Sequence, residues 1–196
     1  MVDKPNDNQH QAITLILDPN PSPPLLLIGP FGTGKTFTLN LACLAILEKS
    51  KQNKVLICTH SNSAANIHLD HLHAKLQKSN SDIRPLRIVA LYRKANTISH
   101  TFWKYCLLNN EKNQFQEPTW KDVDTHNVIV TTLATSRILW KFYQEGKLRF
   151  SHILIDEAAQ ALEPECITPL AMADDKTKVV LAGDHLQVET LAWIVW

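Results

Sequence analysis

The fold of this chain is decided by the stretch Leu25-Leu-Leu-Ile-Gly-Pro-Phe-Gly-Thr-Gly-Lys-Thr36. An apolar run of strand length opens it, and the pattern GxxxxGK[ST] follows over Gly29 to Thr36. Residues Lys35 to Lys49 then carry apolar side chains at helical spacing. A strand, a glycine-rich loop and a helix in this order are the context in which the pattern forms a phosphate-binding loop. The alternative is a glycine-rich turn with a chance lysine.

Each part of this loop has an expected role in holding a nucleotide. Gly32 and Gly34 let the backbone bend so that its N–H groups converge on the phosphates. Lys35 is expected to reach the β- and γ-phosphates, and Thr36 to bind Mg²⁺. The predicted nucleotide-binding residues of the loop are Gly29, Gly32, Thr33, Gly34, Lys35 and Thr36.

The same alternation of strand and helix continues along the chain. Continuous apolar runs are typical of parallel strands buried on both faces, which predicts an α/β fold with a three-layer parallel sheet. A second helix is predicted over Ser63–Gln77. Residues 94–127 fit this rhythm least, because Pro118 interrupts them and only Phe102–Leu108 looks helical, so we interpret them as an insertion. Besides Leu25–Ile28, the predicted strands are Val55–Cys58, Ile88–Ala90, Val128–Val130, Ile153–Ile155 and Val179–Ala182.

Composition narrows the class of protein without naming a partner. The 196 residues are 44% hydrophobic and 20% charged, as expected for one globular domain. The net charge is +1 and no charge run occurs, so electrostatics single out neither a nucleic acid nor a membrane. The four cysteines form neither a zinc knuckle nor a disulfide framework, which favours a reducing compartment. Without a signal peptide or an apolar run of about 18 residues, the expectation is an intracellular, soluble protein, cytoplasmic with the nucleus as the alternative.

A pair of carboxylates follows the predicted strand Ile153–Ile155. Asp156 and Glu157 would lie at its carboxyl end, where ligands of open parallel sheets bind. We expect Asp156 to hold Mg²⁺ through its water shell and Glu157 to orient or deprotonate the attacking water, because phosphoryl transfer is mostly positioning and charge stabilisation. The alternative is a helix cap and a first-turn acid, which is a common arrangement.

Taken together, these motifs resemble superfamily 1 helicases related to the nonsense-mediated-decay RNA helicase. The segments Ile155-Asp-Glu-Ala-Ala-Gln-Ala-Leu-Glu163 and Val180-Leu-Ala-Gly-Asp-His-Leu-Gln187 look most like the helicase-with-zinc-finger subgroup. The resemblance implies that residues 1–187 form the first RecA-like P-loop NTPase lobe of such a helicase, with ATP and Mg²⁺ as cofactors. The catalytic residues it implies are Lys35, Asp156, Glu157, Gln160 and Gln187, with Thr36 and Asp156 at the metal.

Two less specific motifs of that family also occur, in the same order along the chain as in the family. Asn6, Gln9, Ala12 and Ile13 resemble the Q motif, in which the amide of Gln9 would pair with the adenine edge. The segment Gly183–Gln187 resembles motif III, in which Gln187 would sense the γ-phosphate and Asp184 would support coupling. A solvated helix start and a strand-ending turn are the respective alternatives.

The resemblance also implies a nucleic-acid partner, single-stranded and RNA rather than DNA. Ser61 and Asn62 follow the second strand, and Thr131 and Thr132 follow the fourth, so their polar groups could contact phosphate and sugar without reading sequence. Such residues are also ordinary helix caps.

Five basic residues are left without an assigned role. For Arg87 and Arg93 we weigh proximity to nucleic acid equally with surface charge. His68, His71 and His73 invite a metal interpretation, but a solvated helix surface is favoured because no carboxylate or cysteine completes a ligand set.

The sequence departs from the family in three places. Phe31 stands where a proline is usual, and its side chain is expected to point away from the nucleotide. Residues 188–196 are interpreted as a divergent apolar tail, and we expect the second lobe of the family to be missing. We therefore expect a truncated form that cannot unwind alone, whose partner is another protein or a second lobe in trans. The alternatives are a non-catalytic fragment that binds ATP, RNA or a protein partner, and a small-molecule kinase.

Overall fold

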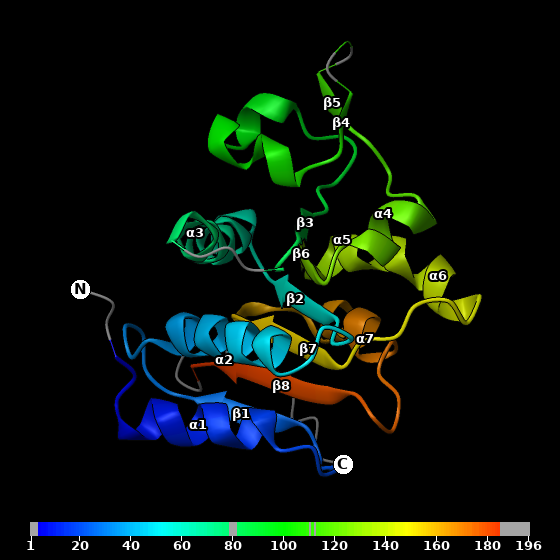
Figure 1. The fold of residues 1–196 in the computed structure, drawn as a ribbon. Coiled ribbons are helices and arrows are strands. Elements are labelled where there is room, and N and C mark those ends of the chain that lie inside the picture. The colour runs from blue at the N-terminus through cyan, green and yellow to red at the C-terminus, as the bar shows by residue number, and fades with distance from the viewer. Residues whose placement is uncertain (1–3, 79–81, 110, 112, 185–196) are drawn as a thin grey trace.

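The computed structural model describes residues 4–78, 82–109, 111 and 113–184. A six-stranded sheet in the order β1-β8-β7-β2-β6-β3 forms its centre (Figure 1). All neighbouring strands in this sheet run parallel. The strands are β1 (Leu25–Ile28), β2 (Val55–Thr59), β3 (Pro85–Arg87), β6 (Val128–Thr132), β7 (His152–Asp156) and β8 (Lys178–Gly183).

Helices cover both faces of the sheet. One face carries α1 (Asp7–Leu17), α2 (Lys35–Lys49) and α3 (Asn62–Lys78). The opposite face carries α4 (Trp120–Thr125), α5 (Leu133–Ser136), α6 (Trp140–Gln144) and α7 (Glu163–Leu170). Short 3₁₀ turns, η3 (Arg137–Leu139) and η4 (Ala158–Gln160), link elements of this second layer. The predicted three-layer α/β fold is confirmed.

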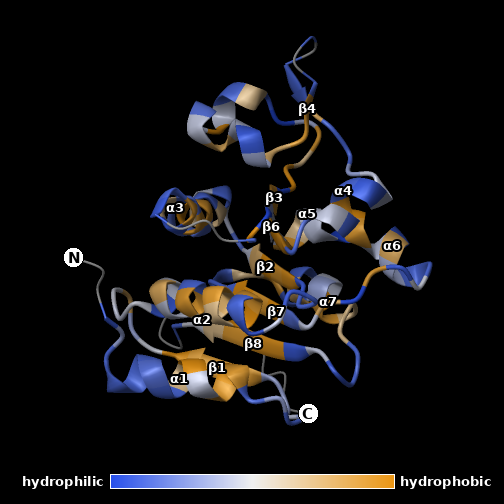
Figure 2. Cartoon of the chain, viewed as in Figure 1, coloured by the Kyte–Doolittle hydropathy of each residue, from blue (hydrophilic) through white to orange (hydrophobic). Residues whose placement is uncertain are grey.

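The strands divide their side chains between two hydrophobic cores. Along β2, Val55 and Ile57 pack under α2 and α3, while Leu56 and Cys58 pack under the helices of the other face. All four are fully buried, which explains why the sequence shows a continuous apolar run instead of an alternating one. Figure 2 shows the apolar centre of the sheet between its two helical layers.

Strand β3 differs from its prediction. The sequence predicts Ile88–Ala90, whereas the strand observed is Pro85–Arg87, paired with β6. Ile88 makes one more backbone hydrogen bond to Val130 and is buried beside the sheet. The apolar run therefore lies beside the strand in the buried part of the chain. The strand itself begins earlier, where the charged Arg87 gave no sign of burial.

The segment 94–127 contains more structure than its composition predicts. It forms the 3₁₀ helices η1 (Ala95–Thr97) and η2 (His100–Tyr105), then an antiparallel pair of strands, β4 (Leu108–Asn109) and β5 (Gln114–Phe115). The 3₁₀ helix η2 stands where an α-helix over Phe102–Leu108 was predicted. After Pro118, Thr119 caps α4 in a reciprocal capping box with Asp122, a start signal that we overlooked.

No helix among the described residues is long and apolar enough to cross a membrane. The predicted tail, residues 188–196, lies outside the described residues.

Candidate functional site

The phosphate-binding loop connects β1 to α2 at the carboxyl edge of the sheet. Gly32 and Gly34 have φ angles of +81° and +82°, the left-handed region that glycine adopts without strain. Lys35 Nζ donates to the backbone oxygens of Gly29 at 2.6 Å and Pro30 at 2.9 Å. The ammonium group therefore lies against the loop itself, at the amino terminus of α2, where partial positive charge also favours phosphate.

Gln9 brings α1 against this loop. Its amide nitrogen donates to the backbone oxygen of Thr33 at 3.2 Å, and a Cβ atom on Gly34 would lie 2.7 Å from the same nitrogen. Asn6 caps α1 in a reciprocal capping box with Gln9, which fixes the glutamine side chain. Glycine at position 34 is thus favoured by its φ angle, and a Cβ atom there would also displace the end of the Gln9 side chain.

Phe31 lies with 88% of its surface exposed, so its side chain points away from the loop, as the sequence predicts. Its backbone N–H donates to Oδ2 of Asp184 at 3.1 Å. Asp184 follows β8 and is buried, so the residue expected to support coupling contacts the phosphate-binding loop directly. Gln187, the expected sensor of the γ-phosphate, lies outside the described residues.

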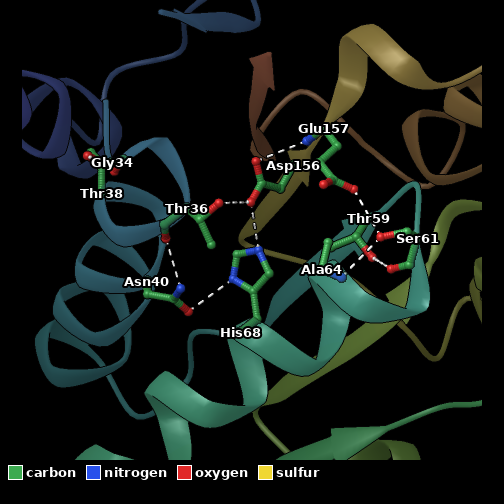
Figure 3. A network of polar contacts seen from close by, with 10 residues as sticks. All are labelled: Gly34, Thr36, Thr38, Asn40, Thr59, Ser61, Ala64, His68, Asp156 and Glu157. Atoms are coloured by element: carbon green, nitrogen blue, oxygen red, sulfur yellow. Dashed lines mark hydrogen bonds and ion pairs between the residues drawn. The ribbon is translucent and has the colours of Figure 1, made fainter. Parts of the chain in front are cut away.

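Asp156 ends β7 directly opposite the start of α2. The Thr36 hydroxyl donates to Asp156 Oδ2 at 2.6 Å, and the Glu157 N–H donates to Oδ1 at 2.9 Å (Figure 3). Thr36 and Asp156 thus present adjacent oxygen atoms, the donor type that Mg²⁺ prefers when it also binds substrate phosphates. These two residues fit the metal that the sequence assigns to them.

His68 is the residue of this site that the sequence analysis missed. It lies on α3 with no exposed surface, and its Nε2 is 3.0 Å from Asp156 Oδ2. The favoured interpretation of His68 as part of a solvated helix surface was wrong. The signal was helical register: His68 shares the inward face of α3 with Ala65, Leu69 and Leu72, all buried.

The environment keeps Asp156 ionised. Burial by itself raises the pKa of this carboxyl, but the hydrogen bond and charge of His68 oppose that effect. With the donors from Thr36 and the Glu157 backbone, the net result is a pKa below its ordinary value. A carboxylate in this state accepts hydrogen bonds or binds a cation.

Glu157 adopts an unusual backbone conformation. Its φ of 58° and ψ of 29° lie in the left-handed region, which costs free energy for a residue with a side chain. Its Oε2 accepts a hydrogen bond from the Ser61 hydroxyl at 3.2 Å. Ser61 in turn accepts from the Ala64 N–H at 3.0 Å and so caps the start of α3. The predicted catalytic base and a predicted nucleic-acid residue are therefore in contact.

The turn η4 after Glu157 is held close to β8. A Cβ atom on Gly183 would lie 3.0 Å from Ala159 Cβ and 3.1 Å from its backbone nitrogen, so a larger residue there requires η4 to shift by a few tenths of an ångström. Gln160 ends this turn and is exposed.

Among the predicted nucleic-acid residues, Asn62 is held by Arg87. The Asn62 side-chain oxygen accepts from the Arg87 guanidinium at 2.9 Å. Arg87 is 1% exposed and also donates to the backbone oxygens of Ile88 and Val130, so the surface-charge interpretation of this residue was wrong. Burial lowers the pKa of Arg87 to about 10.

The structure does not bring Thr131 and Thr132 to the surface. The Thr131 hydroxyl is fully buried and donates to the Ile88 oxygen at 3.1 Å. The Thr132 hydroxyl donates a hydrogen bond to the Thr135 hydroxyl at 2.8 Å. Both hydroxyls are thus used inside the molecule, and the contact of Thr131 and Thr132 with a nucleic acid stays a prediction.

Comparison with known sequences places these features in a family. The model of the family described as AAA domain matches residues 4–121 and 104–191. The chain is 47% identical over 96% of its length to a protein of Danio rerio described as a probable helicase with zinc finger domain. It is 42% identical to the human 3'-5' exoribonuclease HELZ2 over 93% of its length, and 35% identical to the mouse RNA helicase Mov10l1 over 93%. It spans 10%, 6% and 15% of these three relatives.

Solved structures show the same fold. The chain superposes on S. cerevisiae Dbp5 bound to RNA and ADP BeF3 with a TM-score of 0.64 and 20% identity, covering 92% of this chain and 41% of that one. A DEAD box protein from Methanococcus jannaschii gives a TM-score of 0.62 at 16% identity, covering 92% and 44%. At these identities the likeness establishes the fold alone, a RecA-like three-layer α/β architecture.

Proposed function

Since this chain belongs to the AAA domain family of superfamily 1 helicases, we propose that it is an ATP-binding and ATP-hydrolysing lobe whose turnover is coupled to single-stranded RNA. The observation that carries this proposal is the 2.6 Å hydrogen bond from Thr36 to Asp156, which joins the phosphate-binding loop to the carboxylate pair. RNA is preferred to DNA because a relative of this chain is described as an RNA helicase.

Each described residue of the site has a separate role in the proposed hydrolysis of ATP. Backbone N–H groups of the loop, those of Gly32 and Gly34 among them, and the Lys35 ammonium bind the phosphates, while Gln9, whose amide contacts the loop, is the residue expected to pair with the adenine base. Thr36 and Asp156 would hold Mg²⁺, which when bound neutralises charge on the phosphates. Glu157 orients and deprotonates the attacking water, with Gln160 on the same turn. A protein bearing a second lobe is the expected partner, because arginines supplied by such a lobe are worth about 10³ to 10⁵ in rate.

Phosphate release from Mg-ATP by the purified chain, with and without single-stranded RNA, tests the proposal. We expect slow turnover that RNA stimulates and that both Lys35→Ala and Glu157→Gln abolish. Glu157→Gln should still bind ATP, because it changes only the residue that acts on water, whereas Lys35→Ala should lose affinity for the phosphates.

Matched controls lie on the same elements. Lys49, at the other end of α2, also donates to a backbone oxygen, that of Leu17, so Lys49→Ala should retain turnover. Glu163 is exposed at the start of α7, so Glu163→Gln should retain it too. ATP binding that needs Lys35 but gives no turnover, even with RNA, would favour a non-catalytic nucleotide-binding fragment instead.

A further inference from the structure

We propose that His68 is a positioning residue of the Mg²⁺ site, holding Asp156 in place for the metal by tying it to α2. This inference rests on the proposed function, because it concerns the same nucleotide site. It adds a residue that none of the sequence motifs contains.

The side chain of His68 completes a closed ring of hydrogen bonds (Figure 3). Thr36 Oγ1 donates to Asp156 Oδ2 at 2.6 Å, and His68 Nε2 lies 3.0 Å from the same oxygen. On its other side, His68 Nδ1 lies 3.0 Å from Asn40 Oδ1. Asn40 Nδ2 donates to the backbone oxygen of Thr36 at 2.8 Å, which closes the ring. The four residues come from α2, α3 and β7.

Both nitrogens of the imidazole ring face acceptors. The orientation of the Asn40 amide is fixed, because only its NH₂ group can donate to the Thr36 carbonyl, so its oxygen must face His68. Asp156 presents a carboxylate oxygen on the opposite side. His68 therefore bridges two acceptors on opposite sides of its ring, and few other side chains could span the same space.

Because this ring of hydrogen bonds is buried, the loss of one member should weaken Mg²⁺ binding. Asn40 is 2% exposed, Asp156 is 2% exposed and His68 has no exposed surface. Groups buried this deeply have no water to replace a lost partner, so removal of His68 would leave the Asp156 carboxylate free to turn away from Thr36. Outer-shell groups of this kind typically change metal affinity by about 10- to 100-fold when they are removed.

His73 offers a matched control on the same helix. Its Nδ1 lies 2.8 Å from the Tyr105 hydroxyl, and it packs edge-on against the Phe102 ring. A change to leucine there removes one partly buried hydrogen bond of α3 without touching the nucleotide site. Any loss of nucleotide or Mg²⁺ affinity that His68→Leu and His73→Leu share reflects the packing of α3 and not the metal site.

The experiment measures binding of the fluorescent, non-hydrolysable analogue mant-AMPPNP by the full chain, first in EDTA and then during titration with MgCl₂. For His68→Leu we expect the half-saturating Mg²⁺ concentration to rise about 10- to 100-fold, with nucleotide affinity in EDTA unchanged. His73→Leu should alter neither quantity. His68→Gln, which retains an amide donor toward Asp156, should lie between His68→Leu and the unmodified chain.

The outcomes separate this inference from the proposed function. An unmodified chain that binds no nucleotide overturns both. If His68→Leu needs the same Mg²⁺ concentration as the unmodified chain, only the role of His68 is overturned. The same holds if His68→Leu loses nucleotide affinity equally with and without Mg²⁺. If His68→Leu does not fold, His68→Gln carries the same comparison, and an unchanged Mg²⁺ dependence of that variant overturns the inference.

Discussion

At the scale of single residues, the backbone is strained at Glu157, the residue expected to act on the attacking water. Glu157 is one of two non-glycine residues with positive φ in the described part of the chain, and it follows the buried Asp156. A residue with a side chain pays about 1–2 kcal/mol to adopt this conformation. The surrounding contacts, the Ser61 hydroxyl and the fixed Asp156, hold it there. In this conformation the Glu157 carboxylate contacts Ser61, which caps the start of α3.

Two substitutions at this position separate backbone strain from chemistry. Glu157→Gly and Glu157→Ala should both abolish hydrolysis, because each removes the carboxylate. Glu157→Gly should nevertheless be more stable to urea than Glu157→Ala by about 1 kcal/mol, since glycine adopts positive φ without a penalty. Urea denaturation of the two variants measures this difference.

The same pair of changes at Glu163 provides the control. Glu163 starts α7 in helical conformation, where alanine should be the more stable residue by up to about 1 kcal/mol. The sign of the difference should therefore reverse between the two positions. Equal stabilities of the two Glu157 variants would contradict a strained backbone at that residue.

At the scale of elements, α3 joins the two predicted sites. Ser61 at its start contacts Glu157, and His68, two turns later, contacts Asp156. On the other side of these carboxylates, η4 lies against β8, whose last residue is Gly183. Both carboxylates are thus held between a helix of one layer and a turn supported by the neighbouring strand.

The close contact between η4 and β8 predicts that a methyl group added at Gly183 will reduce stability and activity. Gly183→Ala should lower the free energy of unfolding by about 1–3 kcal/mol, because the added Cβ would crowd Ala159 and η4 would have to move away from β8. ATP hydrolysis should fall as well, since Glu157 and Gln160 border the displaced turn. Chemical denaturation and phosphate release measure the two effects.

A second substitution checks the cause. Ala159→Gly in the Gly183→Ala background removes the nearer of the two contacts, at 3.0 Å, but leaves the backbone nitrogen at 3.1 Å. Part of the lost stability should therefore return. A Gly183→Ala chain as stable and active as the unmodified one would show that η4 yields freely and that its position does not control the site.

At the scale of the whole molecule, parallel strands bring distant segments to one edge. The phosphate-binding loop, Ser61 and the carboxylate pair follow β1, β2 and β7, which are separated by other strands or helices in the chain but end at the same side of the sheet (Figure 1). The candidates for RNA contact that remain there, Ser61 and Asn62, are uncharged, and the nearby Arg87 is buried. With a net charge of +1, the molecule offers little general attraction to phosphate.

This charge distribution predicts how RNA binding responds to salt. We expect the slope of log K against log salt concentration to be shallow, about −1 to −2, because each neutralised phosphate of a single strand contributes about −0.7. Fluorescence anisotropy of a labelled oligonucleotide between low and physiological salt measures it. A steep slope would show that lysines and arginines elsewhere on the surface dominate binding.

Local sequence patterns determined the strand–loop–helix at Leu25–Lys49 and most of the sheet. The reason is that continuous apolar runs, glycines at fixed spacing and helical periodicity are properties of neighbouring residues. Predicted α2, Lys35 to Lys49, has the bounds observed, and the carboxylates lie at the carboxyl end of β7 as expected, with Asp156 as its last residue and Glu157 directly after it. The roles given to individual site residues stay predictions, because each depends on a ligand or a reaction.

Only the tertiary structure decided what His68, Arg87 and Thr131 do. Their neighbours are residues far apart in the chain: Asp156 for His68, Asn62 for Arg87 and Ile88 for Thr131. A polar residue within a helix or strand looks the same in sequence whether it faces water or a buried partner. Its burial depends on which elements pack against it, and here that packing turned a histidine expected at the surface into a buried partner of Asp156.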